Sequence, residues 1–588
     1  MSDAAVLSVP RAVSTRAHAG SWVLVASVLA IAAISPFERN VPGAIVGAFT
    51  ISTVEAIVLL SLLAFAATTL TNQVRVLWRS PVSVPAAVLI AVVVLSAALA
   101  PEFQAEAFKA SGRLVAMALV FVLTINAVTS PAVARRLVVA LLIVGSIVGA
   151  IAILELSQLP FVIDGLRAFR PGFHVVGGQV RATSTLFYPT IASMYLEVIF
   201  AIGLGLLAER PSPLLFAGLA LVGGGIIATF TRAGLISMAL SLVMVGWLIH
   251  RREGSWTRAH RVFALLGAVL VTFVFVSHSP EVLMMRFGTD TSQDWYGATY
   301  KAPRRLSFRP GGVYHVPVEV QNTGMLTWQS VDEPTFALSY HWLNASNEDV
   351  VQFDGARTAF DGAVRSGDVA NLNALVRVPG YPGHYILVWD IVQEHRTWLS
   401  TEGIPAGRTD VAVEGEAVTA PLKSLGRLPG ASVRMPRLTL WKAALAMAAE
   451  RPLVGVGPDN YRHLYGRYLQ LANWDQRVHA NNTYLEALAD TGVLGLAALG
   501  WVLAAGARAI RDRWRHATLA SVPMVAALIA AWLSIAGHGL VDSFVTFTPT
   551  YVLFALTAGL TFSPSLKPSS SLKPQAPSLL ETGHANRV

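Results

Sequence analysis

Residues 137–154 read LVVALLIVGSIVGAIAIL, a run without any charged residue, and runs of this kind decide the fold class. A helix of about 20 apolar residues is long enough to cross the hydrocarbon core of a bilayer. Such runs recur along the chain, centred near residues 29, 58, 90, 121, 147, 199, 221, 241, 269, 496, 529 and 556. The sequence therefore predicts an α-helical polytopic membrane protein with about twelve transmembrane helices.

The composition agrees with a membrane protein. Of the 588 residues, 54% are hydrophobic and 13% are charged, whereas an ordinary soluble domain has roughly 25% charged residues. The net charge of +9 comes from Lys and Arg scattered between apolar runs, which argues against nucleic acid as a partner. The chain has no cysteine, so disulfides, thiolate metal sites and cysteine nucleophiles are excluded.

The distribution of basic residues predicts the orientation. With the N-terminus in the cytoplasm, eighteen Lys and Arg residues fall in the inside segments and seven in the short outside loops. Cytoplasmic loops carry the excess of Lys and Arg, so both termini are expected inside. Arg11 and Arg16 precede an apolar stretch from Ser21 to Ser35, which we interpret as an uncleaved first helix because many further spans follow.

A different pattern interrupts the apolar runs between residues 299 and 413. Short alternating segments, such as 313–320 and 385–391, are separated there by Gly and Pro. About seven short strands at this spacing predict an antiparallel β-sandwich inserted on the extracytoplasmic side. The stretch Asn322-Thr323-Gly324, followed by Trp328, resembles a turn of immunoglobulin-like accessory domains.

The insertion contains four tryptophans, namely Trp328, Trp342, Trp389 and Trp398. We expect them to fill its core, and the alternative is that one of them stacks on a carbohydrate. A domain with its own core can be inserted where its ends lie close together. We therefore expect the insertion to fold alone and to contribute recognition, not chemistry.

The chain thus divides into five predicted parts. They are a membrane domain of about nine helices (1–298), the immunoglobulin-like β-sandwich (299–413), an extracytoplasmic catalytic loop with an amphipathic helix (414–484), a membrane domain of about three helices (485–563) and a tail (564–588). The tail is rich in Ser, Pro and Lys without apolar periodicity, which predicts a disordered cytoplasmic segment.

The segment expected to carry chemistry follows the sandwich. Residues 437–445 have a helical pattern, 452–458 (PLVGVGP) form a turn, and Thr483 and Glu486 have the spacing of a capping box. His479 would then lie just before the positive end of a helix, which favours neutral imidazole, the form that a general base requires. The alternative is a surface histidine in a loop.

This segment resembles the family of O-antigen ligases and O-antigen polymerases. The resemblance covers most of the membrane part and not the sandwich. Its motifs are Arg437, the turn at 452–458, His479, Asn482, GVLG (492–495), FTRAG (230–234), Arg181 ahead of FYP (187–189), and HGLVD (538–542). Many members place a histidine directly before the asparagine, where this chain has Asn481. The base is therefore His479 or, as the other nearby candidate, His463.

The resemblance implies transfer of a glycan from undecaprenyl diphosphate to a hydroxyl of an acceptor glycan or lipid. The reaction would take place on the outer face of the bacterial inner membrane. His479 would be the general base. The donor diphosphate would be bound by Arg232, Arg437 and Arg181, with Asn482 and Asp542 in supporting roles.

The residue chemistry fits this reaction independently. Diphosphate is a good leaving group, so the protein needs cations for its charge and a base for the acceptor proton. Arginine binds phosphate oxygens in a bidentate manner. Arg232 lies at the outer end of an apolar span, where a charge is costly unless it functions, although snorkelling to lipid headgroups is the alternative. Asp542 could orient an arginine or histidine, or cap a helix.

We expect no cofactor and no metal, because the outer segments lack a paired-carboxylate motif and a His-x-x-x-His pair. A polymerase of the same family would share the same site chemistry. A transporter or flippase for lipid-linked glycans is a further alternative, but no internal repeat is present. A non-enzymatic glycan sensor built around the sandwich is another alternative, but it would give His479, Arg232 and Arg437 no function.

Overall fold

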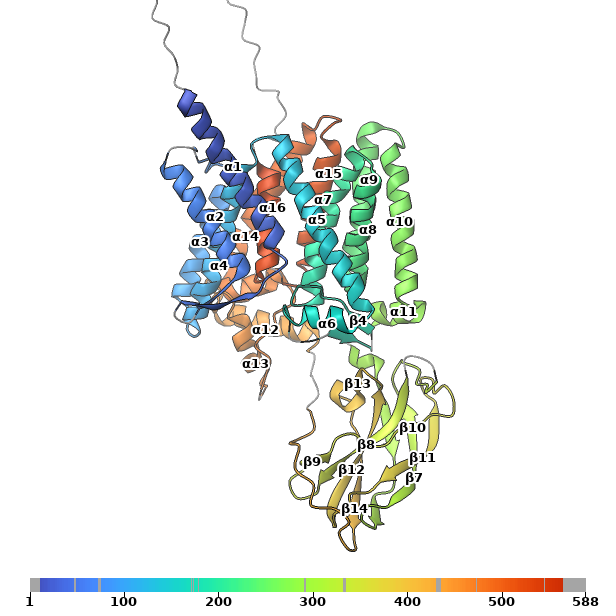
Figure 1. The fold of residues 1–588 in the computed structure, drawn as a ribbon. Helices are drawn as coiled ribbons and strands as arrows, with labels where there is room; N and C mark the ends of the chain where they lie inside the picture. Colours follow the sequence, from blue (N-terminus) through green and yellow to red (C-terminus); the bar gives the residue numbers. More distant parts are fainter. Residues whose placement is uncertain are drawn as a thin grey trace, which may run out of the picture.

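The computed structural model describes residues 11–46, 49–71, 74, 76–170, 172, 174–177, 179–289, 292–331, 335–429, 435–471, 473–543 and 545–563. Within them the protein consists of a helical bundle with a β-sandwich attached at one end (Figure 1). The predicted disordered tail, residues 564–588, lies outside the described residues.

A helix is found at each of the predicted apolar runs. These helices are α1 (Arg11–Ile34), α2 (Thr53–Leu70), α3 (Ser83–Ala98), α4 (Gln104–Ala127), α5 (Pro131–Leu156), α7 (Pro189–Glu209), α8 (Pro213–Ala228), α9 (Arg232–Glu253), α10 (Arg258–Ser277), α14 (Thr483–Arg515), α15 (Val522–His538) and α16 (Thr548–Phe562). Proline stands in the first turn of α5, α7 and α8, where its missing N–H costs nothing and its φ suits a helix.

Seven helices in the described part of the chain are long and apolar enough to cross a membrane, namely α2, α4, α5, α7, α9, α10 and α14. The apolar parts of the other five are shorter. The structure is therefore that of a polytopic membrane protein, and the crossing of the bilayer by all twelve helices stays a prediction. The start of α1 and the end of α16 lie at the end of the bundle away from the sandwich (Figure 1).

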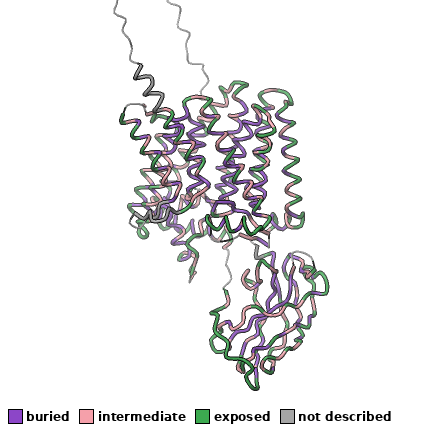
Figure 2. The backbone as a smooth tube through the Cα atoms, viewed as in Figure 1, coloured by how far each residue is buried: buried purple, intermediate pink, exposed green. Residues whose placement is uncertain are grey.

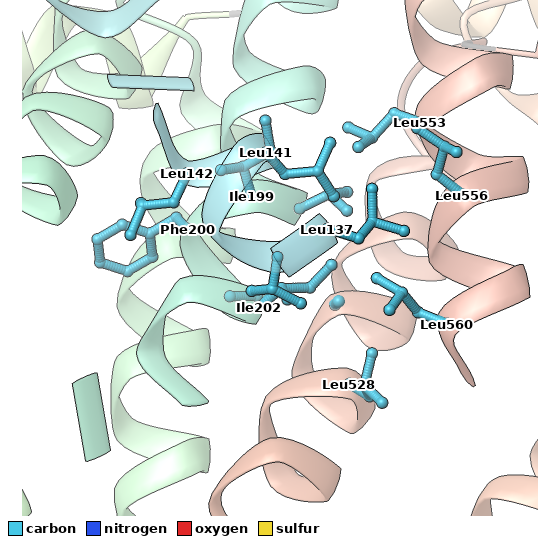
Figure 3. Close-up of a cluster of buried hydrophobic side chains, with 14 of the residues drawn as sticks. Leu137, Leu141, Leu142, Ile199, Phe200, Ile202, Leu528, Leu553, Leu556 and Leu560 are labelled. Carbon is cyan, nitrogen blue, oxygen red and sulfur yellow. The ribbon is translucent and has the colours of Figure 1, made fainter. Parts of the chain in front are cut away.

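Helix α7 forms the centre of the bundle. It is buried along nearly its whole length, whereas α10 at the side is largely exposed (Figure 2). Leucine, isoleucine and phenylalanine side chains of α5, α7, α15 and α16 meet in the cluster of Figure 3, which includes Leu141, Phe200 and Leu556. Helices α5 and α8 approach at Gly149 and Gly225, where a Cβ on Gly225 would lie 2.5 Å from the Cα of Gly149. Small residues allow such close contact between membrane helices.

Short elements connect the long helices. They are β1 (Asn40–Val46), β2 (Phe49–Ser52), α6 (Pro160–Leu166), β3 (His174–Val176), β4 (Gln179–Arg181), α11 (Pro280–Gly288), α12 (Arg437–Glu450) and α13 (Tyr461–Tyr468). Of these, α6, β4, α11, α12 and α13 lie at the end of the bundle that carries the sandwich (Figure 1).

The insertion folds into two β-sheets that share one core. The larger sheet has the order β10-β8-β12-β14-β6, with β13 on β12 and β9 on β8, and the smaller has the order β11-β7-β5. Their bounds are β5 (Ala298–Lys301), β6 (Arg305–Phe308), β7 (Val313–Asn322), β8 (Phe336–Asn344), β9 (Val350–Gln352), β10 (Thr358–Ala359), β11 (Val369–Arg377), β12 (Gly383–Gln393), β13 (Thr397–Trp398) and β14 (Gly407–Val413), with the short 3-10 helices η1 (Ser292–Trp295) and η2 (Leu399–Glu402).

The sandwich differs from the prediction in two details. Strands β14 and β6 pair in parallel, so the sheets are not wholly antiparallel. Trp328, Trp342 and Trp389 are fully buried in the core, as expected. Trp398 is only partly buried, and the guanidinium of Arg357 lies 5.1 Å from its ring centre. The immunoglobulin-like assignment and the domain boundaries stay predictions.

The chain after β14 returns to the sandwich before it enters the bundle. The backbone N–H groups of Val418 and Leu425 donate to the carbonyls of Gly380 and Val350, both at 2.8 Å, and Val350 N–H donates to Gly426 at 2.7 Å. The contacts of the sandwich therefore extend past residue 413.

These contacts lead to a prediction about the isolated domain. Residues 295–428, expressed alone, should fold and unfold cooperatively on heating, monitored by near-UV circular dichroism of the buried tryptophans. The shorter piece 299–413 should be much less stable, because it lacks the buried side chain of Trp295 and nine backbone hydrogen bonds that involve residues 295–298 and 414–428, at about 1 kcal/mol for each bond. A longer piece without a cooperative transition would contradict the domain prediction.

Candidate active site

Two cavities at the sandwich end of the bundle share one wall. The larger has a volume of about 530 Å³ and the smaller of about 370 Å³. Both are lined by Arg181, Thr190, Arg232, Arg286, Arg437 and Asp542. The structure thus brings together the three arginines that the sequence analysis singled out, and adds a fourth. We call Arg181, Arg232, Arg286 and Arg437 the arginine wall.

The larger cavity continues from the arginine wall along the helices α9 and α15. Ile236, Leu240 and Met244 line it on α9, and Ala530 and Leu533 line it on α15. From Arg232 to Met244 the helix rises about 18 Å at 1.5 Å per residue. The cavity therefore joins a cationic end to a long apolar lining, which suits an amphipathic ligand with an anionic head.

Arg181 is held by the turn between α8 and α9, and Arg232 is held by the residue that follows α11. The Nε of Arg181 donates to the carbonyl of Thr229 at 3.2 Å, and its Nη2 donates to Thr231 Oγ1 at 3.1 Å. The Nη1 of Arg232 donates to the carbonyl of Thr289 at 2.6 Å. These bonds fix the orientation of both guanidinium groups at the cavity wall.

Arg286 was not among the predicted site residues. It lies on α11, is 9% exposed, and donates from Nε to the carbonyl of Phe230 at 3.2 Å. The sequence offered one signal, an arginine within the otherwise apolar run of 282–287 before the insertion. Its place beside Arg232 follows only from the packing of α11 against the start of α9.

Arg437 is the first residue of α12, after the N-cap Pro436. Among the residues that the structure describes, none forms a hydrogen bond or ion pair with its side chain. Asp542 lines both cavities beside it. Asp542 does not cap a helix, because α15 ends at His538 and α16 begins at Thr548. That alternative is wrong, and orientation of a cation stays a prediction for Asp542.

His479 lines the smaller cavity together with the arginine wall. Its Nδ1 lies 2.7 Å from Oε1 of Glu486. The other oxygen of Glu486 accepts from Ala480 N–H at 3.0 Å and from Ser543 Oγ at 2.7 Å. The carboxylate therefore holds the imidazole by Nδ1, and Nε2 is the nitrogen that can serve a ligand in the cavity.

The start of α14 corrects the predicted capping box. The helix begins at Thr483, but its N-cap is Asn482, whose Oδ1 accepts from the N–H groups of Tyr484 and Leu485 at 3.0 Å. The Nδ2 of Asn482 donates to the carbonyl of Leu540 at 3.0 Å. Asn482 thus supports the fold of the site without lining either cavity.

The charge of His479 also differs from the prediction. Burial alone lowers the pKa of His479, but the charge and hydrogen bond of Glu486 outweigh it and raise the pKa from 6.5 to about 9. The imidazole is therefore cationic at neutral pH, and the predicted neutral form is wrong. Because the pKa in the folded state is raised, the pair stabilises the fold fully below pH 6.5 and loses this contribution as the pH rises through about 9.

The alternative base, His463, lies elsewhere. It is on α13, stacked on Phe103 with 4.7 Å between ring centres, and it lines neither cavity. Burial lowers the pKa of His463. In the described ranges, no group of three or more His, Asp or Glu residues is arranged to hold a metal ion.

The turn at 452–458 and the GVLG motif at 492–495 meet at a kink in α14. Gly492 has a φ of 65° inside this helix, and a Cβ there would lie 2.3 Å from the carbonyl carbon of Leu453. Beyond the kink, Val493 N–H donates to the carbonyl of Pro452 at 2.8 Å. The turn at 452–458 thus packs directly against the helix that carries Glu486, because glycine leaves room for it.

A comparison with known families finds a match in the segment that carries Arg437 and His479. Residues 416–500 match the family model described as O-antigen ligase. No curated protein matches the chain. Among solved structures, the ASH / PapD-like domain of human CEP192 (PapD-like domain 7) is similar at 17% identity and a TM-score of 0.12, covering 21% of this chain and 89% of that domain. The family match includes Arg437, His479, Asn482, Glu486 and the kink at Gly492, so this segment is similar to the O-antigen ligase family, as its motifs predicted.

Proposed function

We propose that the protein is a glycosyltransferase that moves an oligosaccharide or polysaccharide from undecaprenyl diphosphate to an acceptor hydroxyl on the outer face of the bacterial inner membrane. One observation carries the proposal. The arginine wall lies between an apolar cavity along α9 and α15 and a second cavity that is lined by His479, whose Nδ1 is bound by Glu486.

The donor takes the larger cavity. Its first isoprene units lie along Ile236, Leu240 and Leu533, which are about half exposed and would otherwise face lipid. Its diphosphate lies at the arginine wall, where guanidinium groups bind phosphate oxygens in a bidentate manner. The glycan then points into the smaller cavity, toward His479.

The acceptor hydroxyl enters the smaller cavity and attacks the anomeric carbon of the donor. The new C–O bond forms as the bond to the diphosphate oxygen breaks, and undecaprenyl diphosphate leaves with the electron pair. Nε2 of neutral His479 accepts the hydroxyl proton, and Glu486 stabilises the imidazolium that results. The arginine wall stabilises the charge that grows on the leaving group.

A ligase and a polymerase share this chemistry, and a transporter would not cleave the donor. Isolated membranes should consume undecaprenyl-diphosphate glycan and release free carrier, with a rate unchanged by chelator. Consumption without release, or transport alone, would contradict the proposal. Surface polysaccharides of a deletion strain separate the two enzymes, because loss of all attachment indicates a ligase and single-unit products indicate a polymerase.

The first prediction from this mechanism concerns the base. His479→Ala should reduce turnover by about 10²- to 10⁴-fold, the usual contribution of a general base, and leave the Kd of the donor nearly unchanged. Single-turnover rates and donor titrations measure both quantities. His463→Gln is the matched control and should retain most activity. Full activity in His479→Ala would overturn the assignment.

The second concerns the arginine wall. Arg232→Ala, Arg286→Ala and Arg437→Ala should each cost about 1.5–3 kcal/mol, the range for hydrogen bonds to charged groups, and weaken both donor binding and turnover. Lysine at these positions should restore only part of the loss, because it lacks the bidentate fork.

The control for these variants is Arg477→Ala. Arg477 lines only the smaller cavity and is paired with Asp475 at 2.8 Å. Its loss should change donor affinity much less. Unchanged donor affinity in all three variants of the arginine wall would refute diphosphate binding there.

The third follows from the raised pKa of His479. Since only the neutral imidazole accepts a proton, kcat/KM should rise about tenfold per pH unit below pH 9 and level off above it. Glu486→Gln should lower the pKa of His479 and shift the profile to lower pH. A profile that is flat from pH 6 to 9, or one that Glu486→Gln leaves in place, would contradict a base role.

A further inference from the structure

We propose that Trp295 is a positioning residue through which the docked β-sandwich holds Arg181, Arg232 and Arg286 in the arrangement that binds the donor. The proposal rests on the proposed function of the arginine wall. It assigns the sandwich a part in donor binding, beyond the recognition role expected from the sequence.

The first connection runs from Trp295 to Arg232. Trp295 is the last residue of η1 and is 1% exposed. Its indole Nε1 donates to Thr289 Oγ1 at 2.7 Å, and the carbonyl of Thr289 accepts from Arg232 Nη1 at 2.6 Å. Thr289 Oγ1 also donates to the carbonyl of Met285 at 2.9 Å. One threonine thus links the indole to Arg232 and to the last turn of α11.

The second connection runs to Arg181. The six-membered ring of Trp295 lies against Gly177 in the turn between β3 and β4, where an added Cβ would lie 1.6 Å from Cε3 of Trp295. Arg181 ends β4 and pairs with His174 across this hairpin. The position of the hairpin, and of Arg181, therefore depends on the indole.

The third connection concerns Arg286. The ring of Phe230 is stacked on His278, with ring centres 4.2 Å apart, and the guanidinium of Arg286 lies 5.6 Å from the centre of the Phe230 ring. Phe230 and Met285 are buried in the same hydrophobic cluster as Trp295 and the sandwich core. The base of the arginine wall is thus continuous with the interior of the sandwich.

The backbone of Trp295 is held by hydrogen bonds to the sandwich. The carbonyl of Trp295 accepts from the N–H groups of Met325 and Leu326, both at 3.1 Å. The buried side chain of Asn322 shapes this turn, with Nδ2 donating to the carbonyl of Leu326 at 2.7 Å and Oδ1 accepting from Gly324 N–H at 3.0 Å. The Asn322-Thr323-Gly324 turn therefore fixes Trp295, and Trp295 fixes the supports of the arginines.

A double-mutant cycle tests this connection in the full-length protein. Trp295→Phe keeps an aromatic ring and removes the indole N–H, whereas Thr289→Val removes its acceptor. Each should raise the Kd for undecaprenyl diphosphate by about fivefold, as expected for one hydrogen bond. The Kd of the double variant should be no higher than that of the single variant with the lower affinity, because both substitutions remove the same interaction. Thr289→Ser should restore wild-type affinity.

Trp328→Phe is the matched control. Trp328 is fully buried in the sandwich core, and its indole N–H has no partner among the described residues. It should leave donor affinity unchanged even if it lowers the Tm as much as Trp295→Phe does. Unchanged affinity in Trp295→Phe and Thr289→Val, or additive effects, would overturn the proposal.

The outcome is distinguishable from a failure of the proposed function. If Arg232→Ala weakens binding and Trp295→Phe does not, only the positioning role fails. If the wild type does not bind undecaprenyl diphosphate, the proposed function fails, and hydrogen–deuterium exchange still tests the positioning role. Exchange in residues 179–182 and 229–232 should be faster in Trp295→Phe than in Trp328→Phe, and equal rates would overturn it.

Discussion

The convergence of four guanidinium groups on one cavity wall is the feature on which the candidate site depends. Arg181, Arg232, Arg286 and Arg437 line one wall at the end of an apolar bundle, where like charges are costly to place together. Carbonyls of the α8–α9 turn and of Thr289 hold three of them in fixed orientations. Guanidinium groups held in this way suit an anionic ligand, because they can bind its oxygens in a bidentate manner.

The pair of His479 and Glu486 is held by a different set of contacts. Glu486 lies in the first turn of α14, and its two oxygens bind His479, Ala480 and Ser543. The kink at Gly492 lets the turn at 452–458 pack against this helix, where Val456 N–H donates to the carbonyl of Ala489 at 3.0 Å. The motif of histidine, asparagine and glycines thus builds one local structure, in which Asn482 caps α14, Glu486 on α14 binds His479, and Gly492 makes room for the turn.

The β-sandwich is attached to the bundle next to the arginine wall. Trp295 belongs to the core of the sandwich and also contacts Gly177 and Thr289 of the bundle. An insertion at a long loop is tolerated when its ends lie close together. Here Arg286 precedes the insertion and Arg437 follows it, so the chain leaves and re-enters the bundle at the arginine wall.

The sequence alone determined the membrane class, the positions of the apolar helices and the strands of the insertion, because these follow from local periodicity and from the thickness of a bilayer. It also singled out His479, Arg232, Arg437 and Arg181, through motif and chemistry. Only the tertiary structure decided that Arg286 joins them, that Glu486 binds His479 instead of closing a capping box, and that the imidazole is cationic. The physical reason is that these are contacts between side chains and groups whose spacing follows no local pattern: Arg286 reaches a carbonyl 56 residues away, and the pKa of His479 is set by a carboxylate on the next helix.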